Sequence, residues 1–120
     1  MREQENQMLQ EEQPQRAFLV SLDTGEFDAQ ASLEELYELV RSAGAEPVAS
    51  AMQKRPAPDA AYCVGSGLLE EILETCQVQE IDLLVFDQEL SPTQIRNIED
   101  KSQLRVVDRT MLILDIFAQR

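Results

Sequence analysis

The chain has 120 residues and a formal net charge of −13, from 10 basic and 23 acidic residues. This length suits one ordinary domain with a continuous core, and it excludes a second complete catalytic domain. The negative charge repels phosphate backbones and argues against bulk electrostatic binding of nucleic acid or anionic membranes, so any RNA contact has to be local.

The composition also limits the chemistry. The chain has no His, which removes the commonest acid–base group and the commonest zinc ligand, and Cys63 and Cys76 alone cannot form a zinc site. We interpret both cysteines as small core residues. No stretch approaches the roughly 18 apolar residues of a membrane span, and the amino terminus has no apolar signal region. We therefore expect a cytoplasmic protein with reduced thiols, no metal and no membrane span.

The amino terminus differs in composition from the rest of the chain. Residues 1–16 are polar, rich in Gln and Glu, and lack helical apolar periodicity, so we expect a flexible leader there. The folded domain is then expected over residues 17–120.

Within this domain, apolar patterns predict alternating strands and helices. Short apolar runs of strand length lie at residues 17–22, 47–52, 83–86 and 104–107. Apolar residues at helical spacing predict helices from Ser32 to about Gly44, over residues 68–76, from Ser91 to about Lys101, and after Thr110. Two of these starts have capping-box sequences, SLEE at residues 32–35 and SPTQ at residues 91–94.

This alternation, with connections of a few residues, is the pattern of βαβ units. We predict an α/β fold with a mainly parallel four-stranded sheet, in the order β-α-β-α-β-α-β, flanked by helices. A strongly apolar helix start at residues 111–117 follows the last strand. A helix of that composition needs something further to pack against, so we expect it to mark a cut domain edge.

A short glycine-rich segment precedes the second predicted helix. Gly65, Ser66 and Gly67 suit either a structural turn with a helix cap or a loop that binds phosphate or another anion. The segment has no third glycine and no Lys, and the chain has no P-loop, GxxxxGK[ST]. We therefore expect no catalytic residue and no hydrolysis of GTP or ATP by this chain.

The doublet Lys54 and Arg55 lies in a proline-rich stretch, residues 54–59. Its two interpretations are a solvated loop and a phosphate contact, because Lys and Arg on a stiff loop reach a backbone with little ordering cost. Asp23, Asp87 and Asp108 fall at strand carboxyl ends, but no His, Lys or Ser partner turns them into a catalytic set, and we interpret them as turn formers and helix caps.

Six motifs follow one another along the chain: SLEEL at residues 32–36, AGA at 43–45, QKRP at 53–56, the Tyr62 to Gly67 stretch, FDQELSPTQ at 86–94, and DRTMLILDIFAQR at 108–120. Together they resemble the amino-terminal domain of the HflX family of translational GTPases. The resemblance covers roughly residues 17–120.

The resemblance implies a noncatalytic domain that precedes a helical hairpin and a Ras-like G domain, in proteins that bind the large ribosomal subunit. Its expected partners are therefore ribosomal RNA and the protein's own G domain and hairpin. GTP and Mg are expected only in the G domain, which this chain lacks. Lys54, Arg55 and Arg109 are the candidates for RNA or interdomain contact.

The chain departs from the family at the glycine segment. The family usually has lysines after each glycine, where this chain has Ser66 and Leu68. An RNA contact through those lysines would be lost, which leaves restraint of the G domain as an alternative role. A further alternative is a module that binds ATP or GTP at the strand carboxyl ends, lined by Asp23, Gly65 and Gly67.

Overall fold

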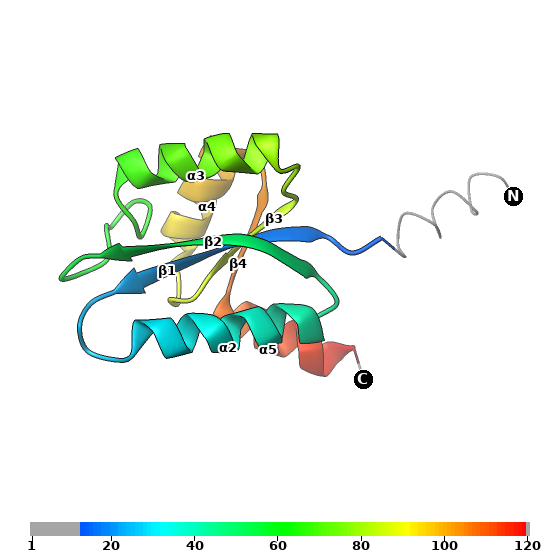
Figure 1. The fold of residues 1–120 in the computed structure, drawn as a ribbon. Coiled ribbons are helices and arrows are strands. Elements are labelled where there is room, and N and C mark those ends of the chain that lie inside the picture. The colour runs from blue at the N-terminus through cyan, green and yellow to red at the C-terminus, as the bar shows by residue number, and fades with distance from the viewer. Residues whose placement is uncertain (1–12, 120) are drawn as a thin grey trace, which may run out of the picture.

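The computed structural model describes residues 13–119. They alternate strictly between strand and helix (Figure 1). The elements are β1 (Arg16–Asp23), α2 (Ala29–Ser42), β2 (Glu46–Lys54), α3 (Ser66–Val78), β3 (Leu83–Phe86), α4 (Pro92–Ser102), β4 (Arg105–Asp108) and α5 (Arg109–Ala118). Residues 1–12 of the predicted leader lie outside the described part of the chain.

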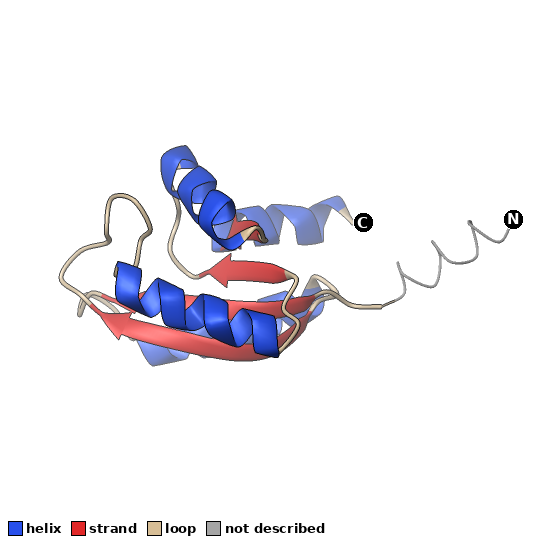
Figure 2. Cartoon of the chain, turned by 90° about the horizontal axis from the view of Figure 1, so that it is seen from above, coloured by secondary structure: helices blue, strands red, loops and turns tan. Residues whose placement is uncertain are grey.

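The four strands form one parallel sheet in the order β2-β1-β3-β4. The predicted α/β fold with a parallel four-stranded sheet is confirmed. Helices α3 and α4 cover one face and α2 and α5 the other (Figure 1), and the view from above shows the strands side by side between these layers (Figure 2). The chain reverses its direction across the sheet between β1 and β3, so the topological switch point lies at the carboxyl ends of these two strands.

The core is aliphatic and divided by the sheet. Along β1, Phe18, Val20 and Leu22 face α3 and α4, while Ala17 and Leu19 face α2 and α5. All five are buried. This alternation follows from the two-residue period of a strand, and burial on both faces explains why β1 reads as a continuous apolar run.

The start of α2 corrects one sequence prediction. The helix begins at Ala29, because Asp28 is the N-cap and its carboxylate accepts the N–H of Ala31 at 3.0 Å. Ser32 therefore lies inside the helix, where its hydroxyl makes a tertiary contact described below. The cap predicted at Ser91 is confirmed with its full capping box, in which Gln94 closes the reciprocal bond.

Candidate functional site

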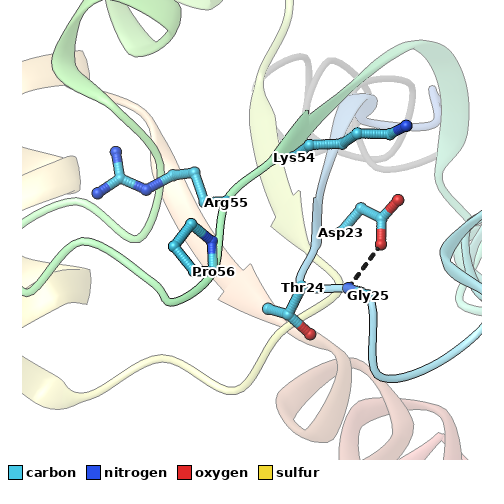
Figure 3. Close-up of a pocket in the computed structure, with 6 residues that line it drawn as sticks. All are labelled: Asp23, Thr24, Gly25, Lys54, Arg55 and Pro56. Atoms are coloured by element: carbon cyan, nitrogen blue, oxygen red, sulfur yellow. Dashed lines mark hydrogen bonds between the residues drawn. The ribbon is translucent and has the colours of Figure 1, made fainter.

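A shallow hollow of about 380 Å³ opens at the carboxyl ends of β1 and β2 (Figure 3). It is lined by Asp23, Thr24, Gly25, Lys54, Arg55 and Pro56. The Asp23 carboxylate accepts the N–H of Gly25 at 2.9 Å, and Gly25 turns the chain with a φ of 84°. Arg55 donates its N–H to the carbonyl of Asp23 at 3.0 Å, so strand pairing continues to the rim of the hollow.

Lys54 and Arg55 carry the positive charge of this hollow. Their side chains leave the backbone on opposite sides (Figure 3), as expected for neighbouring residues at a strand end. Within residues 13–119, neither forms an ion pair. No carboxylate of these residues therefore neutralises either charge through an ion pair.

The Arg55 side chain lies against the start of α3. Its Nε donates to the carbonyl of Ala57 at 3.2 Å. A Cβ placed on Gly65 would lie 3.3 Å from Nη1 of Arg55 and 3.3 Å from Nε2 of Gln53, so glycine allows this close approach. Gly65 also donates its N–H to Oε1 of Gln53 at 2.8 Å.

The predicted anion loop, Gly65, Ser66 and Gly67, forms the start of α3. One of its N–H groups, that of Gly65, is already paired, and Gly65 is the N-cap of α3 without a side-chain bond. Ser66 and Gly67 are exposed. None of the three lines the hollow, so the structure does not bring the glycine segment together with Asp23.

The loop that follows Arg55 closes on itself. Asp59 and Cys63 exchange two backbone hydrogen bonds, each 2.9 Å long. The Asp59 carboxylate accepts the N–H groups of Tyr62 at 2.9 Å and Ala61 at 2.8 Å. These bonds, with a smaller contribution from the charge of Arg55, outweigh partial desolvation and lower the pKa of Asp59.

Helix α4 fixes this loop from the side. Gln94 donates from Nε2 to the carbonyl of Asp59 at 2.8 Å, and Asn97 donates from Nδ2 to the carbonyl of Ala61 at 3.2 Å. The loop is therefore tied at two points to a packed helix. Sequence reasoning identified Gln94 only as a cap residue and missed both long-range bonds, which leave no local sequence signal.

Arg109 is placed in a different environment from the doublet. Its Nε donates to Oδ1 of Asp87 at 2.8 Å, its Nη1 to Glu35 at 2.8 Å, and its Nη2 to the carbonyl of Ser32 at 2.8 Å. The Ser32 hydroxyl donates to Oδ2 of Asp87 at 2.6 Å. Burial alone would lower the pKa of Arg109, but the bonds and charges of Asp87 and Glu35 raise it. This network ties α2, β3 and α5 together.

The switch-point crevice between β1 and β3 is filled by the Gln88 side chain. Its Oε1 accepts the N–H of Leu22 at 2.8 Å, and its Nε2 donates to the carbonyl of Leu22 at 3.0 Å. The amide thus imitates a further strand residue at the point where α/β sheets commonly bind nucleotides.

Cys63 and Cys76 are buried free thiols, and burial raises the pKa of each to about 11. Among residues 13–119, no three His, Cys, Asp or Glu side chains gather in a way that could hold a metal ion. In that same part of the chain, no helix is long and apolar enough to cross a membrane.

Comparison with known proteins identifies a family over most of the chain. The family described as GTP-binding GTPase N-terminal matches residues 30–118. GTPase HflX of Lacrimispora saccharolytica is 46% identical over 109 residues, which cover 88% of this chain and 25% of the relative. GTPase HflX of Escherichia coli K12 is 47% identical over 88 residues, which cover 73% of this chain and 21% of the relative.

Solved structures support the fold. A GTP-binding protein from the hyperthermophilic archaeon Sulfolobus solfataricus, in complex with GDP, matches with a TM-score of 0.62 at 24% identity, covering 87% of this chain and 30% of that one. A complex of SsGBP with GDP matches with a TM-score of 0.66 at 24% identity, covering 88% and 29%. The chain spans about a quarter of the length of the first curated relatives it matches.

Proposed function

The chain belongs to the family of GTP-binding GTPase N-terminal domains found in HflX GTPases, and on this premise we propose that it is a noncatalytic domain that docks on the large ribosomal subunit. In this proposal Lys54 and Arg55 each contact a phosphate of ribosomal RNA, in the cytoplasm. The domain itself carries neither GTP nor Mg. Those ligands belong to the G domain of the GTPase of which the domain is a part.

The observation that carries the proposal is the state of the Lys54–Arg55 doublet. Four other cations, Arg16, Arg41, Lys101 and Arg109, are paired with carboxylates of the chain. The doublet has no such partner within the described residues and lies at the rim of a tied loop. A tied loop loses little conformational entropy on binding, so two phosphate contacts retain most of their free energy.

The remaining unpaired cations provide a matched control. Arg96 on α4 and Arg105 on β4 are exposed and form no ion pair within residues 13–119. Reversing both to Glu changes the net charge by the same amount as reversing the doublet. A contact specific to the doublet is therefore separable from general repulsion by a more negative protein.

The test is cosedimentation of the chain with bacterial large ribosomal subunits. The variant Lys54→Glu/Arg55→Glu is expected to lose most of its binding, while Arg96→Glu/Arg105→Glu retains it. Urea denaturation of both variants checks that they remain folded, because Lys54 ends β2 and Arg55 donates to the carbonyl of Ala57. Equal binding by both variants would overturn the phosphate contact.

A second candidate role is contact with the G domain of the same protein. Helix α5 favours it, since Met111, Leu114 and Phe117 are large apolar side chains left exposed on it. The test uses Escherichia coli GTPase HflX with its matching segment replaced by this chain. If reversal of Lys54 and Arg55 changes the GTPase rate of this chimera but not its ribosome binding, interdomain contact replaces RNA contact.

A nucleotide-binding module finds less support in the described residues. The Gln88 amide occupies the switch-point crevice, and the N–H of Gly65 is already given to Gln53. The glycine of the hollow, Gly25, already donates its N–H to the Asp23 carboxylate.

A further inference from the structure

Lys54 and Arg55 are held in place by different parts of the fold. Lys54 is the last residue of β2 and pairs in register with Asp23 of β1, so the sheet fixes its position. The backbone N–H of Arg55 also bonds to Asp23, but its side chain is held by the loop that follows, because its Nε donates to the carbonyl of Ala57 at 3.2 Å. The direction of the Arg55 guanidinium therefore depends on where the loop places Ala57.

The segment from Arg55 to Asp59 is short and stiff. Pro56 and Pro58 flank Ala57, and each proline ring fixes its own φ angle and restricts the residue before it. Few backbone torsions are left to absorb a displacement at Asp59, so such a displacement moves the Ala57 carbonyl too. Contacts that fix Asp59 therefore also fix the acceptor of Arg55.

Two side chains of α4 provide such contacts. Gln94 donates from Nε2 to the carbonyl of Asp59 at 2.8 Å, and Asn97 donates from Nδ2 to the carbonyl of Ala61 at 3.2 Å. The helix itself is packed through Ile98, which is fully buried in the core on this face of the sheet. The two bonds therefore connect the loop to a part of the domain that is well packed.

The loop is closed in a backbone conformation that its sequence does not favour by itself. Cys63 has a φ of 67°, in the left-handed region that residues other than glycine rarely adopt. It is nevertheless buried, and it exchanges two backbone hydrogen bonds with Asp59. Such a conformation persists only where the surrounding contacts hold it. The bonds from α4 are contacts of this kind.

We propose that Gln94 and Asn97 are positioning residues for the phosphate contact of Arg55. This inference rests on the proposed RNA contact and adds to it a role for α4, whose two side chains act on the RNA only through the loop. While the loop is held, the guanidinium is oriented before RNA arrives, so binding has to order fewer groups. Once the loop is released, only a fraction of the molecules is ready to bind, and the affinity falls by that fraction. The contact of Lys54 is unaffected, because the sheet holds it.

The variant Gln94→Glu/Asn97→Ala, the loop-released variant, removes both bonds and keeps the start of α4. The glutamate can still accept the N–H of Ser91 and complete the capping box, whereas it has no N–H to give to the Asp59 carbonyl. The substitution at Asn97 leaves the cap untouched. The change is therefore confined to the connection between α4 and the loop.

The matched control is Gln77→Glu/Gln119→Ala. Gln77 is exposed on α3, so its substitution adds the same charge away from the loop. The substitution at Gln119 removes a bond of the same kind, from its Nε2 to the carbonyl of Ala43 at 3.2 Å, on the opposite face of the sheet. Any difference between the two variants is then due to the place of the bonds and not to charge or to the number of substitutions.

Two measurements on the chain are compared. In amide hydrogen exchange, the N–H groups of Asp59 and Cys63 should exchange faster in the loop-released variant than in the wild type or the control. Binding to bacterial large ribosomal subunits at about 0.1 M salt should be about threefold to tenfold weaker for the loop-released variant, the equivalent of about one hydrogen bond, and unchanged for the control.

Single substitutions in the doublet separate positioning from a general loss of structure. In an Arg55→Gln background, release of the loop should have no further effect on binding, because no guanidinium remains to be oriented. In a Lys54→Gln background, it should weaken binding as much as in the wild type. A general loss of structure would weaken binding alike in both backgrounds. Circular dichroism verifies that each variant is folded, and if the loop-released variant is not, Asn97→Ala alone takes its place in the same series.

The outcomes distinguish this proposal from the RNA contact on which it rests. Unchanged exchange of the loop, faster exchange without a loss of affinity, or an equal loss in the Lys54→Gln and Arg55→Gln backgrounds would each overturn the positioning role while the doublet keeps its RNA contact. If Lys54→Gln/Arg55→Gln binds as tightly as the wild type, the doublet does not contact RNA, and both proposals are wrong.

Discussion

Removal of Arg109 should destabilise the domain far more than removal of an exposed arginine. Arg109→Ala deletes the bonds to Asp87, Glu35 and Ser32, all 2.8 Å long. The Asp87 side chain is only 1% exposed, so its carboxylate would remain buried with the Ser32 hydroxyl as its main partner. Breaking a buried ion pair costs about 3–5 kcal/mol. Because the Arg109 side chain is itself 22% exposed, we expect a loss of stability at the lower end of this range, about 3 kcal/mol.

The assay is urea denaturation followed by circular dichroism, with Arg41→Ala as the control. Arg41 pairs with Glu38, and both side chains are more than half exposed, so its loss should cost less than about 1 kcal/mol. Arg109→Ala/Asp87→Ala should recover part of the loss, since no unpaired buried charge remains. Equal free energies of unfolding for Arg109→Ala and Arg41→Ala would refute the reasoning.

Four further predictions concern the crevice and the thiols. Millimolar ATP or GTP should leave the melting temperature of the chain unchanged, and the chain should hydrolyse neither nucleotide. A nucleotide that binds and is present at a hundred times its Kd would instead stabilise the folded chain by about 2.7 kcal/mol and raise its melting temperature. Gln88→Ala should lower the free energy of unfolding by about 1–3 kcal/mol in urea, because both backbone groups of Leu22 lose their partner; an unchanged midpoint would contradict this. Cys63 and Cys76, each with a pKa of about 11, should resist thiol reagents at neutral pH until the chain unfolds, and rapid labelling of native protein would contradict their burial. Since unfolded thiols ionise from about pH 9 and folded ones only near pH 11, stability should fall as pH rises through that window.

Local patterns were sufficient to predict the order of elements. The strand at Leu83–Phe86 has the predicted bounds, and the SPTQ cap at Ser91 forms as expected, because Pro in the first turn and Gln94 act within one turn of the chain. At α2 two cap sequences compete. Asp28 takes the N-cap, and Ser32 gives its hydroxyl to Asp87, a residue far away in the sequence.

In the candidate site, too, the sequence predicted features that are local in the chain and missed contacts between distant residues. The charge doublet and its proline-rich loop were visible in the sequence. The bonds from Gln94 and Asn97 that tie the loop to α4 were not, because they join residues 35 and 36 positions apart. Arg109 was predicted as a contact residue alongside the doublet, and only the fold reveals that its nitrogens are engaged by Asp87, Glu35 and Ser32.

The salt dependence of ribosome binding tests the central proposal most directly. Each phosphate contact contributes a slope of about −0.7 to −0.9 to log affinity against log salt, so two contacts by Lys54 and Arg55 contribute about −1.4 to −1.8. Measured with large subunits, the slope of the wild-type chain should exceed that of Lys54→Gln/Arg55→Gln by this amount, while Arg96→Gln/Arg105→Gln should keep the wild-type slope. Identical slopes for the wild type and the doublet variant would contradict the phosphate contact.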